Sequence, residues 1–246
     1  MESTLELQQL SVSLIAKNYN PARITPEFLA ASGIIPHEWQ LAAKPLVTKN
    51  AVQLKFKNGL SVIAKSGSIT FSEAISTKAV EEMEAAKVAT RYLESLPAAD
   101  YQQVRISPMC LYNLGNEDDA VRQLMVEGLL TSAPWHSFGS SPAKAAVNLI
   151  YELERCQLNL KVDEARFQQG ENNAVPGLLF AGDFIYSFSE QSGAEKIESM
   201  KKAIANSQED VSMFQSKISE NIIKTAQAAM SSQPESISQK ALVESV

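Results

Sequence analysis

The sequence predicts an α+β fold: a curved, pseudo-duplicated antiparallel sheet with helices packed on one face. Hydrophobic residues recur at every second position in several segments, which is typical of half-buried strands. In other segments they recur at steps of three and four, which is typical of helices. The order strand, short helix, several strands, helix occurs twice. We therefore expect a first half over 1–97, a second half of the same sheet over 98–228, and a disordered tail over 229–246.

The first half is expected to open with a strand over 10–15, a turn and a short helix. Thr25 precedes Pro26, and proline is tolerated at the first helical position, so PEFLAA is predicted to be helical. Gly33 is expected to end this helix, and 34–41 to enter the next strand. Large apolar residues in such a corner are usually buried, which favours packing over ligand contact. The core candidates here are Phe28, Leu29, Ile34, Ile35 and Trp39.

A three-stranded meander is predicted next. Apolar and polar residues alternate over 52–56, and the pair Asn58 and Gly59 favours a type I′ turn. The chain is expected to return over 60–64, reverse again at 66–67 and continue through Phe71. A change to helical spacing then predicts a helix over 77–96, with Glu81 and Glu82 in its first turns.

The second half is predicted by the same criteria. A strand is expected over 100–115, a short helix over 117–130, a loop over 131–144, a hairpin over 145–168 and an apolar strand over 178–189 in which Gly182 marks a bulge. A long helix is expected over 192–227, with a bend near Asn206 and Ser207. Ser192 and Glu195 have the spacing of a capping box at its start. Its apolar stripe is expected to pack on the protein's own sheet rather than in a coiled coil.

Composition narrows the classes of partner. A formal net charge of −6 removes the electrostatic attraction to phosphate, so no nucleic acid is expected as a partner. The chain shows neither a signal peptide nor an apolar stretch of membrane-spanning length, so we expect a cytoplasmic protein with no membrane partner. Cys110 and Cys156 lie far apart in sequence, which favours two buried thiols in a reducing compartment.

Two resemblances bear on this interpretation. The order of elements resembles the duplicated fold of the TATA-binding protein, in which two repeats share one curved sheet with long helices on its convex face. The residue motifs and the basic sheet surface of that DNA-binding family are absent here. Separately, NPARITPEFLAASGIIPHEW and FKNGLSVIAKSGSITFSEAI are similar to uncharacterised bacterial proteins of cyanobacterial type. That resemblance covers mainly the first hundred residues and implies no functional residues.

No catalytic residue, metal site or cofactor is predicted. His37 and His136 are far apart, and neither has a cysteine or an acid at chelating spacing. No glycine-rich loop leads from a strand into a helix, as phosphate binding would require. Asp183 lies in an apolar run, where it is either buried with a perturbed pKa or on the solvent face; alternation favours the solvent face.

Three functional hypotheses remain. The first is a non-catalytic interaction or scaffold protein that uses its sheet face, sheet edge or long helix to bind another protein or itself as a homo-oligomer. The second is a small-molecule binder with a pocket near 131–142, where Trp135, His136 and Phe138 supply aromatic surface and a titratable group; alternatively, Trp135 and Phe138 plug the end of the core. The third is a hydrolase-type enzyme using His136.

Overall fold

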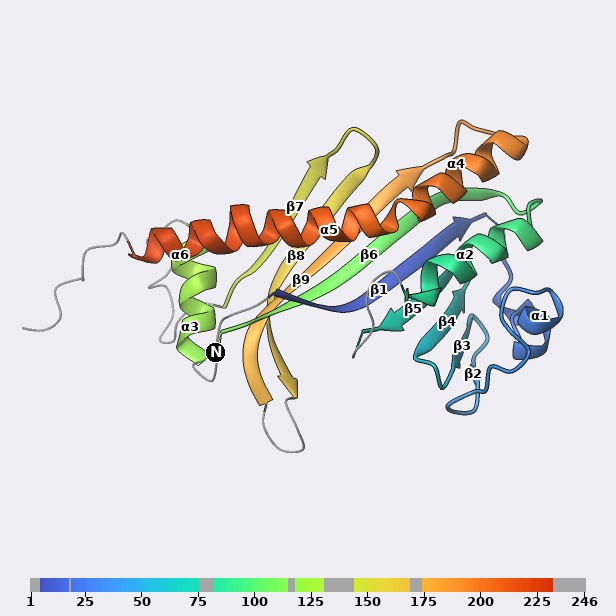
Figure 1. Cartoon of the computed structure of the whole chain (residues 1–246), viewed down its shortest axis with the longest axis horizontal. Helices are drawn as coiled ribbons and strands as arrows, with labels where there is room; N and C mark the ends of the chain where they lie inside the picture. Colours follow the sequence, from blue (N-terminus) through green and yellow to red (C-terminus); the bar gives the residue numbers. More distant parts are fainter. Residues whose placement is uncertain are drawn as a thin grey trace, which may run out of the picture.

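A single antiparallel sheet organises the part of the chain that the structure describes, residues 5–17, 19–75, 82–114, 118–130, 144–168 and 174–231 of a computed structural model. Its strands are β1 (Leu5–Ala16), β2 (Leu46–Val47), β3 (Ala51–Lys55), β4 (Leu60–Lys65), β5 (Ser68–Ala74), β6 (Tyr101–Asn113), β7 (Ala146–Glu152), β8 (Gln157–Gln168) and β9 (Ala174–Ser187). They form one nine-stranded sheet in the order β2-β3-β4-β5-β1-β6-β9-β8-β7 (Figure 1). The predicted α+β class with an antiparallel sheet is confirmed.

The described helices form a layer on one side of this sheet. They are α1 (Pro26–Ala31), α2 (Glu84–Ser95), α3 (Asp118–Gln123), α4 (Gly193–Ala205), α5 (Ser207–Lys217) and α6 (Lys224–Ser231), with a short 3₁₀ turn at Pro21–Arg23 and π-helical segments at Leu124–Leu129 and Ile218–Ile223. Helix α2 packs on β1 and β5, while α4 and α5 pack on β6 (Figure 1). None of the helices within the described ranges is long and apolar enough to cross a membrane.

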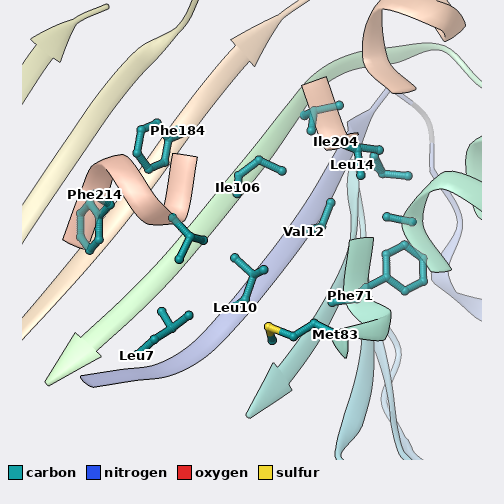
Figure 2. Close-up of a cluster of buried hydrophobic side chains, with 14 of the residues drawn as sticks. Leu7, Leu10, Val12, Leu14, Phe71, Met83, Ile106, Phe184, Ile204 and Phe214 are labelled. Atoms are coloured by element: carbon teal, nitrogen blue, oxygen red, sulfur yellow. The ribbon is translucent and has the colours of Figure 1, made fainter. Parts of the chain in front are cut away.

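The core lies between the sheet and this helical layer. In β1, Leu10, Val12 and Leu14 point to the helices and are fully buried. Figure 2 shows them beside Ile106 of β6 and Ile204 of α4. Burying side chains of this size stabilises a fold by about 1.5–3 kcal/mol each, so this interface dominates the stabilising terms.

The first corner of the chain packs as the sequence predicts. The Thr25 hydroxyl accepts a hydrogen bond from the Phe28 amide at 3.1 Å, which caps α1 at its N-terminus. Gly33 has φ 68° just after the helix. The five expected core residues all join the core cluster, with Leu29, Ile34 and Ile35 buried and Phe28 and Trp39 partly buried.

The predicted meander is confirmed as β3, β4 and β5, but its first turn differs from type I′. The Phe56 amide donates to the Leu60 carbonyl at 2.8 Å, and the Gly59 amide donates to the Phe56 carbonyl at 3.1 Å. The loop therefore has three residues, 57–59, with Gly59 at φ 92°. This is the geometry of a type I turn closed by a glycine in the left-handed region.

Several predicted boundaries were wrong. No strand enters at 34–41, where the only pairing is an isolated bridge between Leu41 and Phe56. Helix α2 begins at Glu84, so Glu82 precedes it, while 76–81 lie outside the described residues. Gly182 marks no bulge, because β9 pairs with β6 and β8 in constant register through it.

The long C-terminal helix is confirmed, with the expected break at Asn206 between α4 and α5. Ser192 stands at the N-cap of α4, but its side chain makes no capping hydrogen bond, so the predicted capping box is absent. The stripe from Met200 to Ile218 packs on the sheet, as expected. Helix α6 continues to Ser231, and the tail beyond it lies outside the described residues.

Candidate interaction surfaces

The residues predicted to form a pocket, Trp135, His136 and Phe138, lie outside the described residues, so the pocket near 131–142 stays a prediction. His37 is exposed in the loop after α1. Within the described ranges, no group of three or more histidine, cysteine or acidic side chains is arranged to hold a metal ion.

The two cysteines are poor nucleophiles in this fold. Cys110 is fully buried in β6, and burial raises the pKa of its thiol to about 12. Cys156 is half-buried in the β7–β8 turn, and burial likewise raises the pKa of its thiol. Because the thiolate is the reactive form, both environments disfavour cysteine catalysis.

The sheet face opposite the helices carries polar side chains that bond across strands. The Ser11 hydroxyl donates to that of Ser72 at 2.9 Å, and Ser13 and Thr70 share a hydrogen bond of 2.8 Å. These pairs connect β1 to β5 and satisfy the hydroxyls locally. Antiparallel sheets commonly have one such solvated face, so these pairs are not by themselves a functional site.

Asp183 lies on this polar face, as alternation favoured. Arg105 donates to one of its carboxylate oxygens at 3.2 Å and Ser107 to the other at 3.0 Å. Burial raises the pKa of the Asp183 carboxyl, and the Arg105 charge and the Ser107 hydrogen bond partly oppose that rise. Both oxygens thus have protein donors that join β6 to β9, which gives Asp183 a structural role.

The large hydrophobic side chains that are exposed in the described part of the chain are confined to the two edge strands. On β2 they are Leu46 and Val47. On β7 they are Leu149, Ile150 and Tyr151, with Ile150 62% exposed. Because exposed apolar side chains beside unpaired backbone groups favour the addition of another strand, the two edges are the candidate interaction surfaces.

The β2 edge is protected against such pairing. It has two residues, Pro45 precedes it, and Lys44 and Lys49 flank it. Short length, proline and lysine are the features that block edge-to-edge association. The β7 edge has seven residues, of which only Glu152 is charged. We therefore take β7 as the exposed edge of the sheet.

The hairpin turn sets which backbone groups of β7 face outward. The Leu153 amide donates to the Cys156 carbonyl at 2.9 Å, so this pair is hydrogen-bonded within the hairpin. In an antiparallel ladder hydrogen-bonded and non-hydrogen-bonded pairs alternate. The residues whose amide and carbonyl groups point away from β8 are therefore Ala146, Asn148, Ile150 and Glu152.

An apolar groove runs beside this edge on the helix side. Its volume is about 230 Å³, and it lies between the β7–β8 hairpin and the α5 helix with its π-helical continuation. The lining includes Tyr151, Leu158, Met213, Phe214 and Ile222. Since Tyr151 pairs with buried Leu158, the odd-numbered side chains of β7 lie on the helix side of the sheet, where Tyr151 lines the groove.

A buried polar network holds the hairpin turn on the long helix. Asp210 of α5 is fully buried, accepts a 2.6 Å hydrogen bond from the Tyr186 hydroxyl, and pairs with Arg155 of the turn at 3.2 Å. Burial raises the pKa of the Asp210 carboxyl, and the hydrogen bond from Tyr186 and the charge of Arg155 partly oppose that rise. The network fixes the end of β7, so the edge is held in place before anything binds.

A second cleft, of about 580 Å³, lies beside α1 and α2. Tyr19 and Tyr92 share a hydroxyl hydrogen bond of 3.0 Å, and Arg23 lines the same cleft. The hydroxyl of buried Tyr101 has no hydrogen-bond partner among the described residues. Burial raises the pKa of all three tyrosines, so their hydroxyls remain protonated donors at neutral pH.

Comparison with known proteins adds no family. A scan against protein-family models finds no match to this chain, and a search of curated proteins finds none. The features of this chain that bear on function are therefore the edge strand, the groove and the cleft. Sequence reasoning did not single out β7, although Ile150, beside Leu149 and Tyr151, breaks the alternation expected of a half-buried strand.

Proposed function

We propose that this protein is a non-catalytic interaction protein that binds another protein chain along the β7 edge. The observation that carries the proposal is that the exposed large apolar side chains of the described residues are confined to the edge strands, of which β7 lacks the protecting features of β2. Strand addition gives affinity through backbone hydrogen bonds and specificity through alternate side chains. The backbone hydrogen bonds would come from the outward-facing groups of Ala146, Asn148, Ile150 and Glu152. The side-chain specificity would come from the groove beside Tyr151.

The order of elements supports a two-half architecture like that of the TATA-binding protein. Strands β1 and β6 are adjacent, and each is followed by a short helix, a meander and a longer helix. The first meander has four strands and the second has three among the described residues. Among the described strands none lies beyond β7, at the position equivalent to that of β2, so this is where an added strand would pair.

The test is site-specific photo-cross-linking along the two edges. A photoreactive phenylalanine analogue at Ile150 is expected to give a covalent adduct with another polypeptide in cells, and the same analogue at Val47 is the matched control on β2. Adding Asn148→Pro should abolish the Ile150 adduct, because proline removes an outward amide while leaving the bonds to β8. Equal adducts at both edges, or no adduct at Ile150, would contradict the proposal.

Small-molecule binding is the second candidate function, and the tyrosine cleft favours it. Tyrosine hydroxyls beside Arg23 suit an aromatic carboxylate, which would accept hydrogen bonds and a charge-assisted pair. We expect 4-hydroxybenzoate and related acids to raise the melting temperature, and Arg23→Ala to remove that shift. A shift lost instead in Trp135→Ala would favour the loop at 131–142, and turnover lost in His136→Ala would favour the enzyme hypothesis.

A further inference from the structure

We infer that the chain that binds the β7 edge is a second copy of this protein, so that two β7 strands join antiparallel across a two-fold axis at Leu149. This inference rests on the proposed function and names its partner. A two-fold interface must be self-complementary, because each residue of one strand meets its symmetry equivalent from the other. The sequence and backbone of β7 meet that requirement in one register.

Backbone geometry limits the possible registers. Two β7 strands can bond only through backbone amide and carbonyl groups that point away from β8, so residues with such groups must pair with each other. In β7 these are the even-numbered residues. Self-pairing can therefore centre on a residue of β7 but not between two residues. Only the register centred on Leu149 pairs all seven residues of the strand. In that register Ala146 meets Glu152, and Asn148 meets Ile150, each through two backbone hydrogen bonds.

The side chains match in the same register. On the helix side, Val147 of one copy lies opposite Tyr151 of the other, and the two Leu149 side chains meet at the axis. Such non-hydrogen-bonded pairs bring side chains closest together. They would extend the row of Leu158, Leu160 and Val162 from each β8, so the apolar layer would continue between the copies.

Charge favours this pairing although the chain is acidic overall. Glu152 faces Ala146, so no like charges meet within the strand. Just beyond it, exposed Lys144 of one copy approaches exposed Glu154 in the turn of the other, with Glu152 on the diagonal. Symmetry produces this contact twice. Exposed pairs contribute about 0.2–1 kcal/mol each, so they set the register more than the affinity.

The first experiment measures mass in solution. Sedimentation equilibrium at micromolar concentration is expected to give twice the chain mass of 26.9 kDa. Leu149→Arg places two guanidinium groups at the axis and should yield a monomer with an unchanged circular dichroism spectrum. Leu46→Arg is the matched control on β2 and should remain dimeric. A wild-type monomer, or a dimer that withstands Leu149→Arg, overturns the inference.

Charge reversal tests the register. Lys144→Glu and Glu154→Lys should each weaken dimerisation by about fivefold, as expected when both symmetry-related copies of an exposed pair of about 0.5 kcal/mol are lost. The double variant should restore the wild-type dissociation constant. Additive weakening in the double variant would overturn the register centred on Leu149.

Disulfide trapping locates the axis. Leu149→Cys should form a disulfide between copies under mild oxidation, identified by the mass of the linked peptides, whereas Val47→Cys should not. The absence of a 149–149 linkage overturns the inference. If the protein is a monomer yet Ile150 still cross-links to a different protein, the second copy is the wrong partner and the proposed function stands. If both experiments fail, both proposals are wrong.

Discussion

At the scale of single residues, the start of α2 is determined by a side chain from another element. Met83 occupies the N-cap position and provides no side-chain cap. Glu73 of β5 caps the helix instead. Its carboxylate accepts hydrogen bonds from the amides of Glu84 at 2.6 Å and Ala85 at 3.2 Å. Glu73 is 1% exposed, and its carboxylate lies at the positive end of the helix dipole. One acidic residue thus joins the sheet to the helical layer.

Removal of this cap should destabilise the fold measurably. Glu73→Ala leaves a buried amide without its acceptor, which costs about 1–3 kcal/mol. We expect the free energy of unfolding, measured with urea, to fall by that amount. Glu82→Ala is the control, since that exposed acid lies two residues before the helix. Equal effects of the two substitutions would show that general charge near α2, rather than the cap, matters.

The two thiols should differ sharply in reactivity. Burial raises the pKa of the Cys110 thiol to about 12, so almost no thiolate forms at pH 8, and the side chain is inaccessible. Cys156 is half-buried and should react slowly. Labelling with iodoacetamide followed by mass spectrometry should therefore modify one thiol in the native protein and two in urea. The rate at Cys156 should rise with pH, whereas Cys110 should stay unmodified up to pH 9.

At the scale of elements, a glycine sets the distance between the long helix and the sheet. A Cβ atom at Gly182 of β9 would lie 2.6 Å from the Phe214 ring of α5, which is closer than atoms in contact can approach. The ring is buried and packs against Phe184 with a centroid separation of 6.1 Å, so it has little room to move. Gly182 therefore provides space for an aromatic anchor.

Filling that space should destabilise the protein. Gly182→Ala is expected to lower the free energy of unfolding by about 1–3 kcal/mol, as overpacked cores do. The smaller side chain of Phe214→Leu should relieve the clash, so the double variant should lose less than the sum of the single losses. Ala181→Ser, on the polar face, should have little effect. Additive losses in the double variant would argue against direct contact.

The sequence predicts a helix or strand well where residues close in sequence determine its start and end. The meander follows from alternation and Gly59, and α1 follows from Thr25 and Pro26. The strand predicted at 34–41 fails because the amides of Ile34 and Ile35 donate to the Leu29 carbonyl of α1, so they cannot join a ladder. The start of α2 depends on Glu73, eleven residues earlier, and no local pattern contains that information.

The candidate site was only partly accessible from the sequence. The general prediction of binding by a sheet edge came from the fold class, and Ile150 supplies a local signal. That β7 lies at an edge, however, follows from the order of strands, which is a long-range property. The loop residues Trp135, His136 and Phe138 remain a prediction from composition alone.

At the scale of the whole molecule, the sheet has a protected centre and two unequal edges. Strands β1 and β6 lie in the middle, paired on both sides and covered by helices α2, α4 and α5 (Figure 1). At one end β2 is short and flanked by lysines, and at the other β7 is longer and apolar. Hydrogen exchange should therefore be slowest in the centre and fastest at the edges.

Exchange of individual amides by NMR separates the two edges and tests the dimer. In dilute monomer, the amides of Asn148, Ile150 and Glu152 should exchange rapidly, because they point away from β8, whereas Val147, Leu149 and Tyr151 should be protected. Raising the concentration should protect the even-numbered amides as two β7 strands pair.

The control is the outward amide of Val47 on β2. The Thr48 amide donates to the Ala51 carbonyl at 2.8 Å, so by alternation the neighbouring Val47 amide faces away from β3. Its exchange should be fast at every concentration, because no described strand pairs with that edge and its lysines and proline disfavour pairing with another copy. If the even-numbered amides of β7 behave like Val47 at all concentrations, the edge stays unpaired in solution. In that case the predicted alternation of fast and slow exchange along β7 would be correct, and the proposed self-association would be wrong.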